Sequence, residues 1–364
     1  MDFSCSRRKF FHTTLAAAGI GVSALRSAQG VPGVAGSQAS EVGSQPGPRS
    51  VVSLIKGEDR RKNVYDALMG VDDLLAPQLR KKSSVVIKPN NVSTIKQLAS
   101  THADALRGIL DYLQERFKGN VVIAESSAGN TWDGFENFLY TRLPGEYKKL
   151  NVSLVDLNKE GRYEILYILD GDMHITPVRL ASRLLDPDAF ILNAGVLKTH
   201  NAVVATLSIK NMALGAPLHQ GPDEKGRWSD KRKYHGSVRQ AHFAIMQTAQ
   251  KLAPFWGATL VDGFEGMEGN GPASGTPVPS RLALASTDFV AADRVGIEAM
   301  GIDPEWPAYL NYCGEVGIGQ YDLDRIDIRG AKIADVRKEY RLHRDIERQL
   351  LWRGPMLEIP PKLG

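Results

Sequence analysis

The sequence contains only two cysteines, Cys5 and Cys313, and no CxxC pair. Zinc ribbons and iron–sulfur clusters need sets of thiolate ligands, which these two residues cannot supply. Cys5 lies in a segment that we expect to be removed, so Cys313 has no partner for an internal disulfide. We therefore expect no iron–sulfur cluster, and any metal would be bound mainly by oxygen or imidazole.

The chain also lacks a strongly basic region outside its first residues. Its net charge is +4, and residues 1–50 hold five basic residues against two acidic ones, so only +1 remains for the rest. No basic helix or strip of aromatic and arginine residues favours nucleic acid as a partner. The P-loop, the GxSxG elbow and a GxGxxG loop opening a helix are missing as well.

No apolar run after the first residues is long enough to span a membrane. At the start, Arg7 and Arg8 precede a short apolar core, Leu15–Leu25, in the order typical of a twin-arginine signal. We predict a signal peptide over residues 1–28, export by the twin-arginine machinery and a periplasmic or other extracytoplasmic location. Residues 29–50 are rich in Gly, Ser, Pro and Gln, which predicts a flexible linker.

The remainder, residues 51–364, is predicted to be one α/β domain. Short runs rich in Val and Ile alternate with helical patterns, which indicates a largely parallel sheet with helices on both faces. We expect an antiparallel pair over Tyr163–Leu180, as an edge or a small lobe, and a surface loop over Pro217–Lys233. The helical patterns cover Val64–Leu75, Ala103–Phe117, Ala202–Leu214 and Val238–Leu252, and Arg337–Arg353 is predicted to be a solvated helix.

Polar residues follow two of the predicted strands at their carboxyl ends, where ligands bind in such folds. Lys88 and Asn90 follow one strand, and Glu125 ends another. A lysine there suits a phosphate or carboxylate, although a solvated strand end is an equal alternative. Glu125 suits a metal ligand, a general base or a ligand-binding turn.

A third group begins after the strand Phe190–Val196. Lys198 and His200 stand two residues apart, and thus on one side of an extended chain. Lys210 and Asn211 follow in the apolar stretch Ala202–Leu214, whose only charge is Lys210. A buried ammonium needs a partner or loses its proton, so we predict that Lys210 anchors an anion or acts as a base. The alternative is a lysine that completes the end of its helix.

A fourth group is rich in carboxylates and glycine. Asp262–Pro272 holds three carboxylates and four glycines in eleven residues, which predicts a loop closing a strand. Oxygen ligands of this kind suit Mg²⁺, Mn²⁺ or Ca²⁺, so Asp262 and Glu268 are candidate metal ligands and Asn270 a candidate ligand-binding residue. A plain glycine-rich turn is the alternative.

The chain resembles the family known as domain of unknown function 362, from about residue 51 to residue 330. The matching segments are VVIKPN, LKTHNAVVATLSIKNMALG, LVDGFEGMEGNGPASGTP, STDFVAADRVGIEAMG and CGEVGIGQYDLDRIDIRG. Many members carry a ferredoxin-like iron–sulfur module, which this chain lacks. The resemblance implies shared site positions at Lys88, Asn90, Lys198, His200, Lys210, Asn211, Asp262, Glu268 and Asn270, and it supplies no reaction.

Together these residues favour an exported enzyme that acts on a small anionic metabolite. The lysines and amides would hold its carboxylate or phosphate, and His200, Lys210 or Glu125 would move a proton, with a divalent cation as a candidate helper. A non-catalytic ligand-binding protein and a redox protein loaded with a cofactor before export are the alternatives.

The leader generates the first prediction. Replacing Arg7 and Arg8 together by lysine removes the guanidinium pair on which the twin-arginine signal depends, so the protein should stay in the cytoplasm. Cell fractionation of the tagged double variant and of the wild type measures this. Normal export of the double variant would contradict the predicted location.

Overall fold

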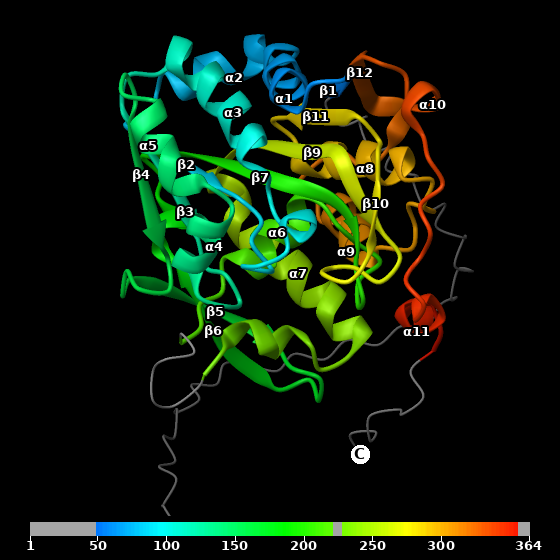
Figure 1. Ribbon diagram of the computed structural model, residues 1–364. Coiled ribbons are helices and arrows are strands. Elements are labelled where there is room, and N and C mark those ends of the chain that lie inside the picture. Colours follow the sequence, from blue (N-terminus) through cyan, green and yellow to red (C-terminus); the bar gives the residue numbers. More distant parts are fainter. Residues whose placement is uncertain (1–48, 221–227, 356–364) are drawn as a thin grey trace, which may run out of the picture. The chain divides into compact units, whose positions relative to one another are not determined.

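A sheet of ten strands organises the described part of the chain, residues 49–220 and 228–355 of the computed structural model (Figure 1). The predicted signal peptide, and the linker as far as residue 48, lie outside these residues. Along the sheet the order is β12-β1-β11-β9-β7-β2-β3-β4. These strands are β1 (Ser50–Lys56), β2 (Ser84–Lys88), β3 (Asn120–Glu125), β4 (Asn151–Asp156), β7 (Ala189–Thr199), β9 (Trp256–Glu268), β11 (Leu282–Ser286) and β12 (Ile326–Gly330).

Most neighbours in this sheet are parallel, as predicted. The run β9-β7-β2-β3-β4 is parallel throughout, and so is the pair β1 and β12. Only β11 and two short strands, β8 (Ala205–Thr206) and β10 (Thr276–Val278), lie antiparallel to their neighbours in the described sheet. The whole of β7 is buried, because it lies in the middle of the sheet with helices over both faces.

Helices cover both faces, and the strands show why. Successive residues of β2 point to opposite sides, so that Val85 joins one apolar cluster and Val86 the other. The first cluster packs under α1 (Arg60–Met69), α2 (Asp72–Leu79), α3 (Ala103–Arg116), α4 (Thr131–Asn137) and α5 (Leu143–Glu146). The second packs against α6 (Ser208–Gly215), α7 (Val238–Leu252), α8 (Phe289–Ala299) and α9 (Ala308–Glu315). Figure 1 shows the two groups on either side of the sheet.

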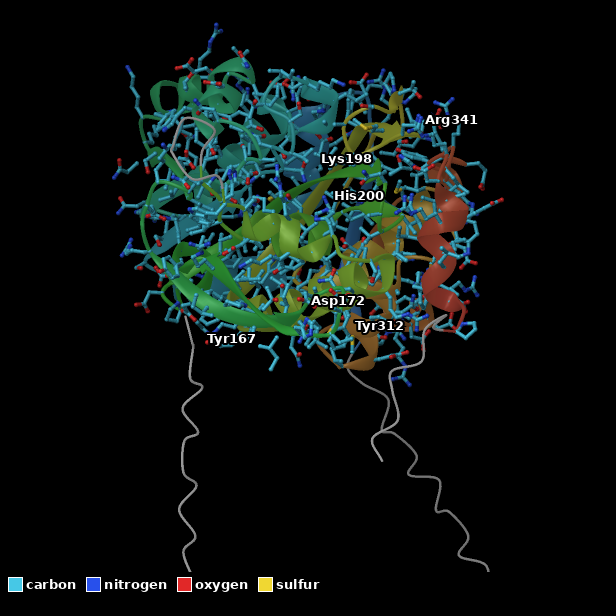
Figure 2. All side chains as sticks on the ribbon, turned by 90° about the horizontal axis from the view of Figure 1, so that it is seen from below. Tyr167, Asp172, Lys198, His200, Tyr312 and Arg341 are labelled. Atoms are coloured by element: carbon cyan, nitrogen blue, oxygen red, sulfur yellow. The ribbon has the colours of Figure 1, made fainter. Side chains whose placement is uncertain are left out.

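The predicted antiparallel pair is present as a separate two-stranded sheet, β5 (Tyr163–Leu169) and β6 (Ile175–Ala181). Its inner side chains, such as Ile168 and Val178, belong to the cluster around α7. Its outer side chains are exposed, and Tyr167, labelled at the edge of the molecule in Figure 2, is 62% exposed. Within the described residues, no helix combines the length and the apolar character that crossing a membrane requires.

Four predicted elements differ from the structure. Val64–Leu75 is divided between α1 and α2, because the chain turns at Gly70, where a Cβ would lie 2.2 Å from Ser53 Oγ. In Ala202–Leu214 only the second half is helical: the chain first reverses at residues 200–204 and pairs β8 with β7. Asp262–Glu268 is not a loop, because β9 continues to Glu268.

The fourth is the solvated helix expected over Arg337–Arg353. Helix α10 (Ile333–Val336) ends before that segment, which itself forms α11 (Ile346–Gln349) and a final 3₁₀ turn, Leu350–Arg353. Tyr340, His343 and Gln349 are buried, so the segment packs against the body of the protein although its charges are mixed.

The start of α6 is held by a residue of another helix. Its own N-cap, Leu207, offers no side-chain hydrogen bond, and Asp293 of α8 accepts from the N–H groups of Ser208 (2.8 Å) and Ile209 (2.9 Å) instead. Asp293 is fully buried. Burial raises the pKa of its carboxyl from 3.8 to about 7, although these hydrogen bonds act in the opposite direction.

This gives a pH-dependent stability prediction. Because the folded pKa exceeds the unfolded one, the folded state binds the Asp293 proton more tightly, and stability is lost as the pH rises from about 4 to about 7. The Asp293→Asn variant lacks this titration. We expect the wild type to lose stability relative to the variant over that range, by up to about 1.4 kcal/mol per pH unit, and no further change above it. Urea unfolding of both proteins across the pH range measures the difference; a flat difference would show that the carboxyl ionises near its ordinary pKa.

Candidate active site

The strand order creates a crevice between β2 and β7. The chain leaves β2 toward β3 on one side and leaves β7 toward β9 on the other, although β2 and β7 are parallel neighbours with Lys88 beside Asn193. Helices that depart in opposite directions leave room at the carboxyl ends of two such strands, which is where ligands bind in open α/β sheets.

A pocket of about 540 Å³ lies at this place, within the usual size for small-molecule sites. Its walls come from the ends of β2, β3 and β7, from α6 and from residues on both sides of the segment 221–227. Six residues predicted from the sequence line it: Lys88, Asn90, Glu125, His200, Lys210 and Asn211.

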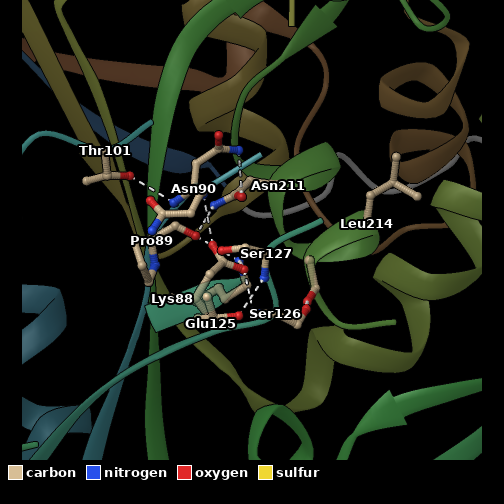
Figure 3. Close-up of polar contacts among 12 residues, drawn as sticks. Lys88, Pro89, Asn90, Thr101, Glu125, Ser126, Ser127, Asn211 and Leu214 are labelled. Atoms are coloured by element: carbon tan, nitrogen blue, oxygen red, sulfur yellow. Dashed lines mark hydrogen bonds and ion pairs between the residues drawn. The ribbon is translucent and has the colours of Figure 1, made fainter. Parts of the chain in front are cut away.

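A buried ion pair joins two of the strands (Figure 3). Lys88 Nζ lies 2.7 Å from Glu125 Oε1 and donates to Pro89 O, and both side chains are at most 3% exposed. The carboxylate also accepts from the N–H groups of Asn91 (2.9 Å) and Ser126 (2.7 Å). Burial lowers the pKa of Lys88, and the attraction of Glu125 opposes this shift. Glu125 is therefore engaged in holding Lys88 and two loops.

Helix α6 lies directly against this pair. A Cβ at Gly215 would stand 2.5 Å from Lys88 Nζ, so only glycine allows this approach. The same helix brings Lys210 and Asn211 to the pocket.

Side-chain amides form a chain between the elements. Asn90 Nδ2 donates to Asn211 Oδ1, and Asn211 Nδ2 donates to Asn193 Oδ1, each at 2.8 Å. Asn193 in turn donates to Thr259 Oγ1 of β9 (2.8 Å). Asn90 and Asn211 were predicted to bind a ligand. They line the pocket, but these amide groups bond to one another and fix α6 to the sheet.

Lys198 is a support beneath the pocket and is not part of its wall. Its Nζ donates to Asn90 Oδ1 (2.7 Å) and to Ala99 O (2.5 Å), and the side chain is fully buried. Burial lowers its pKa well below the ordinary value, with a further contribution from the nearby charge of Lys210. Its contact with a ligand is therefore indirect, through Asn90.

His200, labelled near Lys198 in Figure 2, lines the pocket and is buried. Its Nδ1 accepts from Ala202 N at 3.1 Å, which leaves the proton of a neutral ring on Nε2. Burial and the charge of Lys210 lower its pKa well below 6.5. At neutral pH, His200 is thus a neutral hydrogen-bond donor.

Lys210 is the least engaged of the buried lysines. It lines the pocket and is 5% exposed, yet its ammonium has no hydrogen bond or ion pair with any residue in the ranges 49–220 and 228–355. Burial, together with repulsion by Lys88, lowers its pKa to about 7, and attraction by Glu125 opposes the shift. Lys210 therefore exchanges its proton readily at neutral pH.

The structure adds residues that the sequence did not single out. Lys231 donates to Ser126 Oγ (2.9 Å) and Leu214 O (2.8 Å), and burial lowers its pKa to about 7. Arg232, His219 and His235 also line the pocket. Lys231, Arg232 and His219 come from the segment predicted as a surface loop, and His235 lies just after it; their mixed charges matched a solvated loop and did not indicate a pocket wall.

The predicted metal ligands do not meet. Asp262 forms an ion pair with Arg60 of α1 (Nε to Oδ2, 3.2 Å), whereas Glu268, six residues further along β9, accepts from Arg341 N at 2.9 Å. Asn270 Oδ1 accepts from Arg344 N at 3.3 Å. None of these three residues lines the pocket. Because β9 stays extended, Asp262 and Glu268 stand on the order of 20 Å apart along the strand, too far to share one ion.

One group of carboxylates and imidazole does gather elsewhere in the described residues. Asp170, Asp172 and His174 place one ligand atom each within 4.8 Å of one another in the turn between β5 and β6. Asp170 Oδ1 accepts from the backbone N–H groups of Asp172 and His174, so this arrangement is that of a hydrogen-bonded turn.

The chain belongs to the family Domain of unknown function (DUF362), whose model matches residues 85–298 and thus spans the pocket. It is similar to the thylakoid-associated protein sll1697 of Synechocystis sp., with 26% identity over 246 residues, which are 67% of this chain and 70% of that protein. A crystal structure from Thermotoga maritima resembles 57% of the chain at 9% identity and a TM-score of 0.38. The match spans about half, 51%, of that structure.

The ion pair generates the next prediction. Glu125→Gln leaves the buried Lys88 without its counter-charge, so the free energy of unfolding should fall by about 3–5 kcal/mol. The double variant Lys88→Met with Glu125→Leu removes both charges and should lose less than Glu125→Gln does. Urea unfolding of the double variant and of the two matching single variants, Lys88→Met and Glu125→Leu, together with Glu125→Gln, tests this. Additive losses would show that the two side chains stabilise the fold independently.

Proposed function

We propose that this member of the family is an enzyme that binds a small anionic metabolite, bearing a carboxylate or phosphate, and that Lys210 moves a proton on it. The observation that carries the proposal is the buried, unengaged ammonium of Lys210 in a pocket of small-molecule size. Buried lysines with a structural role are paired with a carboxylate or another acceptor. Lys210 has no such partner among the described residues, and its side chain lines the pocket.

The charge around the pocket favours an anion. Lys88, Lys210, Lys231 and Arg232 contribute positive charge to its walls, and Glu125 is the one carboxylate among the lining residues that the structure describes. Lys88 and Lys231 each donate two hydrogen bonds to protein groups and keep a third N–H for a ligand oxygen. His200 adds a neutral donor through Nε2.

Lys210 suits proton transfer because both of its forms are populated near neutral pH. As an ammonium it protonates or anchors the ligand, and as an amine it takes a proton back. This reassigns the roles expected from the sequence: Glu125 holds Lys88, and His200 orients the ligand. The proposal assigns no divalent cation to Asp262 and Glu268, because each is bound by protein groups away from the pocket.

The proposed place of action is outside the cytoplasm, which rests on the sequence of the leader alone. A folded protein crossing by the twin-arginine route would arrive with this pocket already formed.

A paired binding experiment tests the proposal. Ligands that bind only the folded state raise its melting temperature, so a thermal-shift screen of small carboxylates and phosphates identifies anions that bind. Lys210→Met should keep the fold, since methionine is apolar and of similar length, and should lose about 1.5–3 kcal/mol of affinity for the best anion. In the wild type the affinity should also fall as the pH rises above 7, because the ammonium groups of Lys210 and Lys231 lose their protons, and Lys210→Met should remove its share of this slope, up to about tenfold per pH unit.

Lys231→Met is the matched control, because Lys231 titrates in the same range. The part of the pH slope that Lys210 contributes should persist in this variant. A slope that disappears in Lys231→Met and persists in Lys210→Met would contradict the assignment. Exchange of ligand hydrogens with deuterated water then separates the enzyme from a non-catalytic binding protein, since a protein that only binds leaves the carbon-bound hydrogens in place.

A further inference from the structure

The lysines of the site differ in what their nitrogen atoms do. Lys88, Lys198 and Lys231 each donate hydrogen bonds to oxygen atoms of the protein, and every such bond requires the nitrogen to keep its hydrogens pointed at a fixed acceptor. Lys210 has no such acceptor among the described residues. It is the one pocket lysine in these ranges whose nitrogen lone pair can turn toward a ligand without breaking a protein contact.

Two neighbours suit that nitrogen for bond formation. Lys88 repels a proton on Lys210, and a lysine next to another cation in a desolvated site is an activated nucleophile. The same Lys88, with Lys231, offers hydrogen-bond donors to an oxygen atom that gains negative charge when a carbonyl is attacked. The pocket thus combines a free amine with stabilisation of an oxyanion.

We propose that Lys210 forms a covalent imine with its ligand, and that the ligand is therefore an anion that also carries a carbonyl group, such as a 2-oxo acid. This rests on the proposed function, since the same anion site holds the ligand. The amine lone pair forms a C–N bond to the carbonyl carbon, and the two hydrogens of the amine leave with the carbonyl oxygen as water. A C=N double bond remains, and no oxidant or reductant is needed.

Reductive trapping tests the imine. The full-length protein is incubated at neutral pH with glyoxylate, pyruvate or 2-oxoglutarate and sodium cyanoborohydride, which reduces an imine to a stable secondary amine. Peptide mass spectrometry should find Lys210 carrying the mass of the acid less one oxygen atom. Lys62, whose side chain is 70% exposed, is the internal control for non-specific labelling. An excess of lactate, an anion without an aldehyde or ketone group, should suppress labelling of Lys210 and leave the labelling of Lys62 unchanged.

Two variants separate this inference from the proposed function. Lys210→Arg keeps a cation for the anion but has no amine that can form an imine, so lactate should still raise its melting temperature while the adduct is lost. Lys210→Met should lose the adduct and bind lactate more weakly, and it tests the assignment of the adduct to Lys210 if the larger arginine does not fold. Labelling of Lys210 no greater than that of Lys62, or labelling of Lys231 in its place, overturns the imine. So does a rise in melting temperature with the 2-oxo acids without any adduct, which would leave the proposed function standing.

Discussion

The buried pair of Lys88 and Glu125 is the interaction on which the site depends. It ties the end of β2 to the end of β3, and Glu125 also binds the backbone of the two loops that follow these strands. An ion pair at this depth gives little net stability, because both charges lose their hydration, but a single charge left there would be costly. The ion pair matters because it fixes the ammonium of Lys88 next to α6, where Gly215 allows a close approach. From this position the charge of Lys88 helps to lower the pKa of Lys210.

Around this pair, buried polar side chains form hydrogen bonds with one another, which removes the energetic cost of burying them unpaired. The chain of amides from Asn90 through Asn211 and Asn193 reaches three strands and one helix, and Lys198 supports it from below. These donors and acceptors are paired within the protein, and Lys210 is left as the pocket lysine without a protein partner among the described residues. Asp293 holds the start of the same helix, so α6 is fixed at its first turn and against the sheet.

The sequence was informative where local pattern decides position. Strand ends followed by polar residues placed Lys88 and Glu125 at one edge, and a single charge in an apolar stretch identified Lys210, even though half of that stretch is not helical. It failed where proximity in the chain was taken for proximity in space: β9 continues through Asp262–Glu268 and carries these carboxylates apart. Lys231 could not be predicted, because its place in the pocket depends on contacts with Ser126, which is 105 residues away in the sequence, and with the end of α6.

The close packing of several lysines also determines how their protonation changes when a charged ligand binds in the pocket. Burial, together with repulsion by the neighbouring ammonium groups, lowers the pKa values of Lys210 and Lys231 to about 7. An anion that binds in the pocket raises these pKa values again, because its negative charge stabilises the protonated lysines. Ligand binding and proton uptake are therefore coupled in the same groups, and the ligand itself sets the protonation state of Lys210. A ligand with both a carboxylate and a carbonyl would use the two forms in turn: the charged lysines for its anion and the neutral amine for its carbon.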